Sequence, residues 1–130
     1  MDTVVDRLIR YAKVYSESDY HAGRSATPST DRQFDMAKLL VEELRGLGID
    51  NAFVDQHCYV YAWLPATPGY ERLPAIGLIA HMDTTPDMTG KDVKPQVLHY
   101  DGGDLVLNRK QNIVMEAARF PELTKFAGQD

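Results

Sequence analysis

The fold class of this chain follows from residues 73–87, which read Leu73-Pro74-Ala75-Ile76-Gly77-Leu78-Ile79-Ala80-His81-Met82-Asp83-Thr84-Thr85-Pro86-Asp87. Residues 75–80 carry no charge and no alternation of polar side chains, which predicts a strand covered on both faces, as in a parallel sheet. The two threonines and Pro86 end that strand. We therefore expect an α/β protein in which a buried strand delivers polar residues to the edge of a sheet.

His81 and Asp83 are the candidate functional residues of this stretch. Residues i and i+2 of an extended segment point to the same side, so Asp83 can hold one ring nitrogen of His81 while the other binds a metal ion. In open α/β sheets, ligands bind outside the carboxyl ends of the strands, where this pair falls. A histidine after a strand is more often an ordinary hydrogen-bonded loop residue, so the triplet alone leaves both interpretations open.

The segments around the triplet resemble the tripeptide aminopeptidases of the M20 family of di-zinc peptidases. The resemblance is ungapped around the triplet and extends over essentially the whole chain. The segments that carry it are residues 74–87, 89–96, 100–104, 25–30, 44–48 and 63–66. It implies a three-layer α/β/α zinc-peptidase catalytic domain with a mixed sheet. Residues 1–130 would be its amino-terminal part, truncated before the later metal motifs and lacking the lid/dimerisation domain.

The same resemblance implies roles for the two candidate residues. His81 would bind one of two zinc ions, and Asp83 would be the catalytic residue that orients its imidazole. The family's bridging carboxylate, glutamate base and remaining ligands would lie beyond residue 130. The implied reaction of the complete enzyme is the release of the N-terminal residue from tripeptides, with this chain inactive alone. The alternative is a non-catalytic module that self-associates or binds a partner through an uncovered sheet edge.

Composition excludes several other classes of protein. The chain has 130 residues, 44% of them hydrophobic and 25% charged, and a net charge of -5, so we expect a globular domain that binds neither nucleic acid nor membranes. The N-terminal segment lacks the pattern of a signal peptide, which favours the cytoplasm. The single cysteine, Cys58, excludes an internal disulfide and is interpreted as a small apolar strand residue.

Helical spacing of apolar residues predicts two helices in the first half of the chain. The first covers residues 3–15. The second begins at Thr30, which with Gln33 forms a predicted capping box, and ends at Gly46 or Gly48. Its expected apolar stripe is Phe34, Ala37, Leu40, Val41, Leu44 and Leu47, and its expected water-facing residues are Asp35, Lys38, Glu42, Glu43 and Arg45.

Short strands are predicted on either side of the triplet. Residues 49–55 and 58–64 form a predicted hairpin, in which the alternating aromatics are structural. Residues 97–100 and 105–107 are predicted strands around the Gly102-Gly103 turn, and residues 113–126 are short helical or irregular. The remaining histidines, His21, His57 and His99, are interpreted as surface or hydrogen-bonded residues, since none has metal-ligand spacing.

Overall fold

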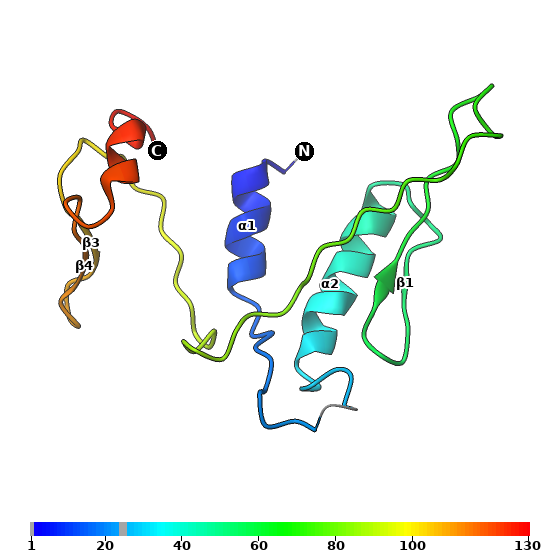
Figure 1. Cartoon of the computed structure of the whole chain (residues 1–130), viewed down its shortest axis with the longest axis horizontal. Coiled ribbons are helices and arrows are strands. Elements are labelled where there is room, and N and C mark those ends of the chain that lie inside the picture. Colours follow the sequence, from blue (N-terminus) through cyan, green and yellow to red (C-terminus); the bar gives the residue numbers. More distant parts are fainter. Residues whose placement is uncertain (1, 24–25) are drawn as a thin grey trace. The chain divides into compact units, whose positions relative to one another are not determined.

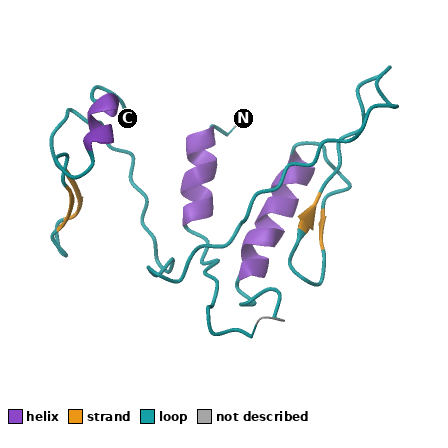
Figure 2. Cartoon of the chain, in the orientation of Figure 1, coloured by secondary structure: helices purple, strands orange, loops and turns teal. Residues whose placement is uncertain are grey.

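The computed structural model describes residues 2–23 and 26–130, and it divides into two compact units, Met1–Pro95 and Gln96–Asp130. Each unit contains one two-stranded antiparallel sheet and at least one helix, joined by long loops (Figures 1 and 2). The chain is therefore a small α/β protein, which confirms the predicted class at that level. Of the segment 25–30 named above, residue 25 lies outside the described residues.

Helix α1, Val4–Ala12, confirms the first predicted helix, although it ends three residues earlier. It begins with a capping box: the Thr3 hydroxyl accepts a hydrogen bond from the Asp6 amide at 3.1 Å, and the Asp6 carboxylate accepts one from the Thr3 amide at 2.9 Å. The Thr3 hydroxyl also donates to the Asp6 carboxylate at 2.7 Å, and this hydrogen bond, followed by the one from the Thr3 amide, lowers the pKa of Asp6. Asp6, at the third helical position, thus accepts the hydrogen bond from the N-cap amide that Glu or Gln accepts in most capping boxes.

Helix α2, Gln33–Gly46, begins later than predicted, and the predicted capping box is wrong. The Thr30 hydroxyl donates to the Glu17 carbonyl at 2.8 Å, and Thr30 lies two residues before the observed N-cap. The Gln33 side-chain amide donates to the Ser29 hydroxyl at 2.9 Å and to the Thr30 hydroxyl at 3.4 Å. The N-cap residue is Arg32, whose side chain makes no capping hydrogen bond. The helix therefore begins without the reciprocal capping hydrogen bonds that the local pattern predicted.

The predicted apolar face of α2 is only partly buried. Ala37 and Val41 are buried, together with Met36, whereas Leu47 is 52% exposed. The predicted end is confirmed, because Gly48 has a φ of +88° and the Ile49 amide donates to the Leu44 carbonyl at 3.0 Å. This is the usual arrangement in which a left-handed glycine ends a helix.

The predicted hairpin is confirmed by strands β1, Phe53–Val54, and β2, Val60–Tyr61, which pair antiparallel and lie along α2 (Figure 1). Its turn is held by the Asp55 carboxylate, which accepts hydrogen bonds from the His57 and Tyr59 amides, both at 2.9 Å. Cys58 lies in this turn and is 2% exposed. Burial, with a smaller contribution from Asp55, raises the pKa of its thiol, which agrees with a small apolar residue. The predicted place of Cys58 in a strand is wrong, because the residue lies in the turn between β1 and β2 with a φ of +66°.

The aromatic side chains of the hairpin stack on one another. The Phe53 ring lies 5.3 Å from the Tyr61 ring and 5.9 Å from the Trp63 ring, and the last two lie 6.1 Å apart. Tyr59 meets Tyr61 edge-on. Such pairs stabilise a sheet beyond the area they bury. The predicted structural role is consistent with this stacking, although the four rings remain 41–56% exposed.

The second unit contains β3, Leu105–Asn108, paired antiparallel with β4, Ile113–Met115, and the 3-10 helix η1, Pro121–Phe126. The prediction that residues 97–100 form a strand around Gly102-Gly103 is wrong. Tyr100 instead forms an isolated bridge with Gln129. Strand β3 pairs with β4, which follows it in the chain, and not with residues 97–100. Both glycines do have the predicted positive φ, at +106° and +79°.

The predicted buried strand over residues 75–80 is also wrong in this structure. Within the described residues no strand pairs with this segment, and Ile76, Leu78 and Ile79 are 89%, 95% and 100% exposed. A strand of a parallel sheet is buried only when neighbouring strands flank it and helices cover both faces. The sheets of this structure contain two strands each, and neither includes this segment.

Candidate functional site

His81 and Asp83 lie together as the i, i+2 spacing predicted. The Nδ1 atom of His81 lies 3.2 Å from an Asp83 carboxylate oxygen and 3.0 Å from the Asp83 carbonyl oxygen. Two acceptors at Nδ1 favour the tautomer that carries its proton there, which leaves the lone pair of the ring on Nε2. The His81 side chain is 86% exposed. The ring is therefore oriented through one nitrogen, and its side chain is open to solvent.

The backbone around this pair is held by the segment that follows α1. Glu17 and Thr84 form an isolated parallel bridge. In this bridge the Thr84 amide donates to the Ser16 carbonyl at 3.3 Å, and the Ser18 amide donates to the Thr84 carbonyl at 2.9 Å. The motif is thus anchored at its carboxyl end, whereas the apolar segment before it is exposed.

The loop after the motif is tied back to the same segment. The Gly90 amide donates to the Glu17 carboxylate at 2.8 Å, and the Arg32 guanidinium lies 3.7 Å from that carboxylate. A side chain at Gly90 would meet the Thr84 hydroxyl at 2.9 Å, so this close approach requires glycine. Glu17 was not a predicted site residue. Its carboxylate accepts a hydrogen bond from the nearby Tyr15 hydroxyl at 3.3 Å, but Arg32 and Gly90 lie 15 and 73 residues away, beyond the reach of a local pattern.

The metal-binding capacity of the described residues is limited to part of a site. Among them, no group of three or more His, Cys, Asp or Glu side chains is close enough to hold a metal ion. An imidazole whose second nitrogen meets a carboxylate has the chemistry of one zinc ligand with its orienting partner. His81 and Asp83 therefore fit one ligand position of a metal site, and a complete site requires further ligands.

The other histidines have ordinary surroundings, as predicted. His99 Nδ1 lies 2.6 Å from an Asp130 carboxylate oxygen, and its Nε2 lies 3.6 Å from Asp101. His57 lies in the hairpin turn, with its ring 3.2 Å from the Gln56 amide. The pairing of His99 with Asp130 could not be read from sequence, since 31 residues separate them.

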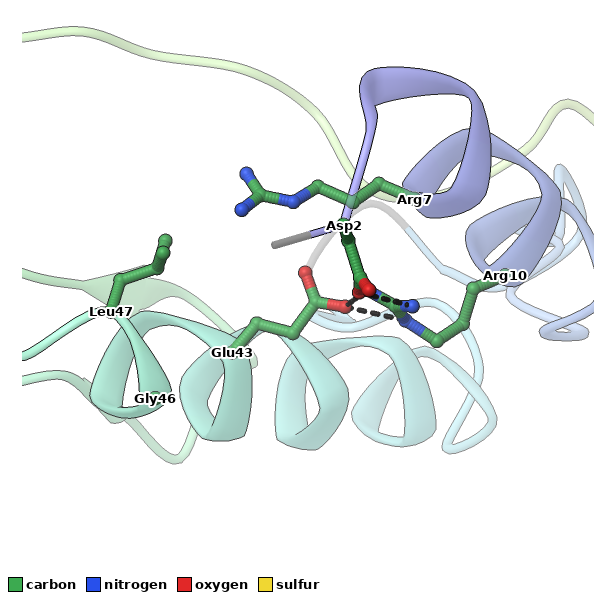
Figure 3. Close-up of a pocket in the computed structure, with 6 residues that line it drawn as sticks. All are labelled: Asp2, Arg7, Arg10, Glu43, Gly46 and Leu47. Carbon is green, nitrogen blue, oxygen red and sulfur yellow. Dashed lines mark hydrogen bonds and ion pairs between the residues drawn. The ribbon is translucent and has the colours of Figure 1, made fainter.

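A second cluster of charged residues joins α1 to α2 next to a pocket of about 400 Å³ (Figure 3). The Glu43 carboxylate accepts hydrogen bonds from the Arg10 guanidinium and the Tyr11 hydroxyl. Arg10 also lies 2.8 Å from Asp2. The lining residues are Asp2, Arg7, Arg10, Glu43, Gly46 and Leu47. Neither His81 nor Asp83 lines this pocket.

Glu43 was predicted to face water, and this prediction is wrong. Its side chain is 17% exposed. Burial alone would raise the pKa of Glu43, but the hydrogen bonds from Tyr11 and Arg10 outweigh it and lower the pKa. Hydrogen bonding to Glu43 raises the pKa of Arg10, while burial, followed by the bond to Glu43, raises the pKa of Tyr11. The cluster links the two helices through the Glu43 carboxylate.

The chain is similar to several curated proteins over nearly its whole length. Peptidase T of Alkaliphilus oremlandii is 47% identical over 131 residues, which is 99% of this chain and 32% of that protein. Peptidase T of Clostridium acetobutylicum is 44% identical and that of Halothermothrix orenii 45% identical, each over 130 residues, 99% of this chain and 31% of the relative.

These matches cover almost all of this chain but only part of each relative. No protein-family model matches the chain. None of the described helices is long and apolar enough to cross a membrane. The chain spans about a third of the length of the curated relatives it matches. The chain is accordingly similar to peptidase T over almost the whole of its own length.

Proposed function

We propose that this chain is the amino-terminal part of a zinc-dependent aminopeptidase of the M20 family that releases the N-terminal residue from tripeptides. The proposed peptidase activity rests on relatives that are 44–47% identical over almost the whole chain. Zinc, the M20 family and tripeptide substrates come from the resemblance of the His81-Met82-Asp83 region. In this proposal residues 1–130 belong to a three-layer α/β/α catalytic domain, and segment 75–80 becomes a strand of its sheet.

One observation carries the proposed site: both Asp83 acceptors lie at Nδ1 of His81. His81 would bind a zinc ion through Nε2, and Asp83 would hold the imidazole in the tautomer that makes this possible. When bound, zinc ions supply an activated water and polarise the scissile carbonyl. Zinc sites use three or four protein ligands, so we propose that residues outside this chain complete the site. Alone, the chain would then be inactive.

Zinc titration of two chains tests this proposal. We expect weak binding by the 130-residue chain and tight binding by a version that also carries the remaining two thirds of the peptidase T length. In the longer chain, Asp83→Asn should lower zinc affinity about 10- to 100-fold, because it removes the partner that orients His81. Equally tight binding by both chains would contradict the proposed incompleteness.

Asp92→Asn is the matched control for Asp83→Asn. Asp92 is exposed and lies in the loop after the motif with a φ of +56°, a conformation that asparagine also tolerates. Its zinc affinity should equal that of the unchanged protein. A loss at Asp92 equal to the loss at Asp83 would show a general effect of charge on zinc binding, and the assigned role of Asp83 would be lost.

The proposed cellular location is the cytoplasm. The only cysteine is a buried thiol in the hairpin turn, so the chain forms no internal disulfide. That is the usual condition of proteins in a reducing compartment. Short peptides are the proposed partners in the proposed reaction.

A further inference from the structure

Ser16 is a polar residue completely removed from solvent, with 0% of its surface exposed. It lies just after α1, and its hydroxyl donates a hydrogen bond to the Met82 carbonyl at 3.1 Å. Met82 is the residue between His81 and Asp83. A buried hydroxyl is costly unless it is paired, so this contact accounts for the position of Ser16.

Ser16 holds the two peptide groups that flank Asp83. Its hydroxyl binds the carbonyl of the peptide before Asp83, and its own carbonyl accepts the amide of the peptide after Asp83, from Thr84, at 3.3 Å. In a trans peptide the N–H and C=O point in opposite directions. Fixing the Thr84 amide toward Ser16 therefore turns the Asp83 carbonyl away from Ser16, and that carbonyl lies 3.0 Å from His81 Nδ1.

We propose that Ser16 is a positioning residue for the metal ligand: it orients the backbone of Asp83 so that both Asp83 acceptors face Nδ1 of His81. It acts through Asp83 and touches neither His81 nor a substrate. Its consequence for catalysis rests on the proposed function, whereas its effect on the His81 ring does not. Ser16 and Met82 lie 66 residues apart, which explains why the sequence pattern of the triplet did not reveal it.

The ring tautomer of His81 tests this inference without zinc or substrate. Ring ¹⁵N chemical shifts of the 130-residue chain, measured at about pH 8.5, where an ordinary imidazole is neutral, should report a dominant Nδ1–H form. Ser16→Ala should shift the population toward the Nε2–H form. Ser16→Thr keeps the hydroxyl and should restore the original shifts. A purely structural role would lower stability but leave the ring shifts of folded molecules unchanged.

Ser18→Ala is the matched control. Its hydroxyl donates to the Thr84 carbonyl at 3.1 Å, one peptide beyond those that flank Asp83, and its amide remains bound to the same carbonyl. We expect unchanged His81 ring shifts in this variant. If Ser16→Ala does not fold, Ser16→Cys is measured in its place. A thiol is a weaker donor than a hydroxyl, so the His81 ring shifts should lie between those of the Nδ1–H and Nε2–H forms.

Two outcomes would overturn the inference: unchanged ring shifts in folded Ser16→Ala or Ser16→Cys, or equal shifts in Ser16→Ala and Ser18→Ala. In the longer chain, Ser16→Ala should also lower zinc affinity about 10-fold, the lower end of the range for groups that orient a ligand, and Ser16→Thr should restore it. If the longer chain binds no zinc, the proposed function is contradicted. The ring shifts of the 130-residue chain still test whether Ser16 positions Asp83 against His81.

Discussion

Glu43 shows how a single carboxylate can link two helices. It lies on α2 and receives hydrogen bonds from Arg10 and Tyr11, both on α1. Surface ion pairs usually contribute little, but this carboxylate is largely shielded from solvent and bound by two donors. The link between α1 and α2 therefore depends on Glu43 being ionised.

We predict that the chain loses stability in acid through Glu43. Its pKa in the folded chain is below its ordinary value of 4.5, so its ionised form stabilises the folded state above that pH. This stabilisation is lost as the pH falls through the lowered pKa. Thermal melting at a series of pH values should show a decrease in melting temperature below about pH 4.5 that Glu43→Gln makes smaller, together with a lower melting temperature at neutral pH.

Glu42→Gln provides the control, since Glu42 is the exposed neighbour on the same helix. It removes the same charge without touching Arg10 or Tyr11. Its melting temperature should follow that of the unchanged chain at each pH. If the two variants behaved alike, net charge and not the linkage to α1 would explain the acid dependence.

Sequence reasoning identified individual residues well where their partners are close in the chain. Asp83 was placed at His81 because the two are two residues apart in an extended segment. Glu43 was misassigned because its partner Arg10 lies 33 residues away, and Ser16 was missed because Met82 lies 66 residues away. Spacing along the chain carries no information about such contacts.

Helix α2 ends at two glycines whose backbones differ, and this difference gives a prediction. Gly46 is the last helical residue, whereas Gly48 follows the helix with a φ of +88°. No atom lies within 4 Å of a Cβ built on either residue, so only backbone conformation distinguishes them. Gly48→Ala should destabilise the chain by about 1–2 kcal/mol, the cost of a left-handed conformation with a side chain.

Gly46→Ala is the matched variant and should stabilise the chain by about 0.5–1 kcal/mol, since alanine loses less conformational entropy in a helix. Urea unfolding followed by circular dichroism measures both changes. Equal effects of the two substitutions would contradict the conformation assigned to Gly48.

The helices and the hairpin, whose patterns are local, could be predicted from the sequence. The strand expected over residues 75–80, which needs neighbouring strands, could not. Helices α1 and α2 follow from apolar spacing, and the β1–β2 hairpin follows from two short runs around a turn. Segment 75–80 has the composition of a buried strand, yet no strand among the described residues pairs with it. The apolar composition of this segment indicates that it suits a buried position in a sheet. Such a position requires neighbouring strands on both edges and covering helices on both faces.

The exposed apolar segment has a consequence for the chain as a whole. Ile76, Leu78 and Ile79 are almost fully exposed, and a contiguous apolar strand segment without partners is prone to pair with another chain. We predict that the 130-residue chain self-associates, so that its mass in light scattering rises with protein concentration. Ile79→Lys should reduce this rise, because a charge opposes strand pairing between copies.

Met88→Lys controls for added charge. Met88 is also apolar and 77% exposed, but it lies outside the 75–80 segment. Its light-scattering mass should match that of the unchanged chain. A constant monomer mass for the unchanged chain at every concentration would contradict self-association. Equal reductions by both lysine substitutions would instead place the association elsewhere than in this segment.

The bridge between Glu17 and Thr84 also orders events during folding. Residues 16–18 and 82–84 meet only after the intervening chain, which contains α2 and the hairpin, has been synthesised and brought together. Contacts of such long sequence separation form late, because the entropy of closing the loop is lost before the contact is gained. We therefore expect the orientation of the His81 ring to be established late in folding, after the helices and the hairpin have come together.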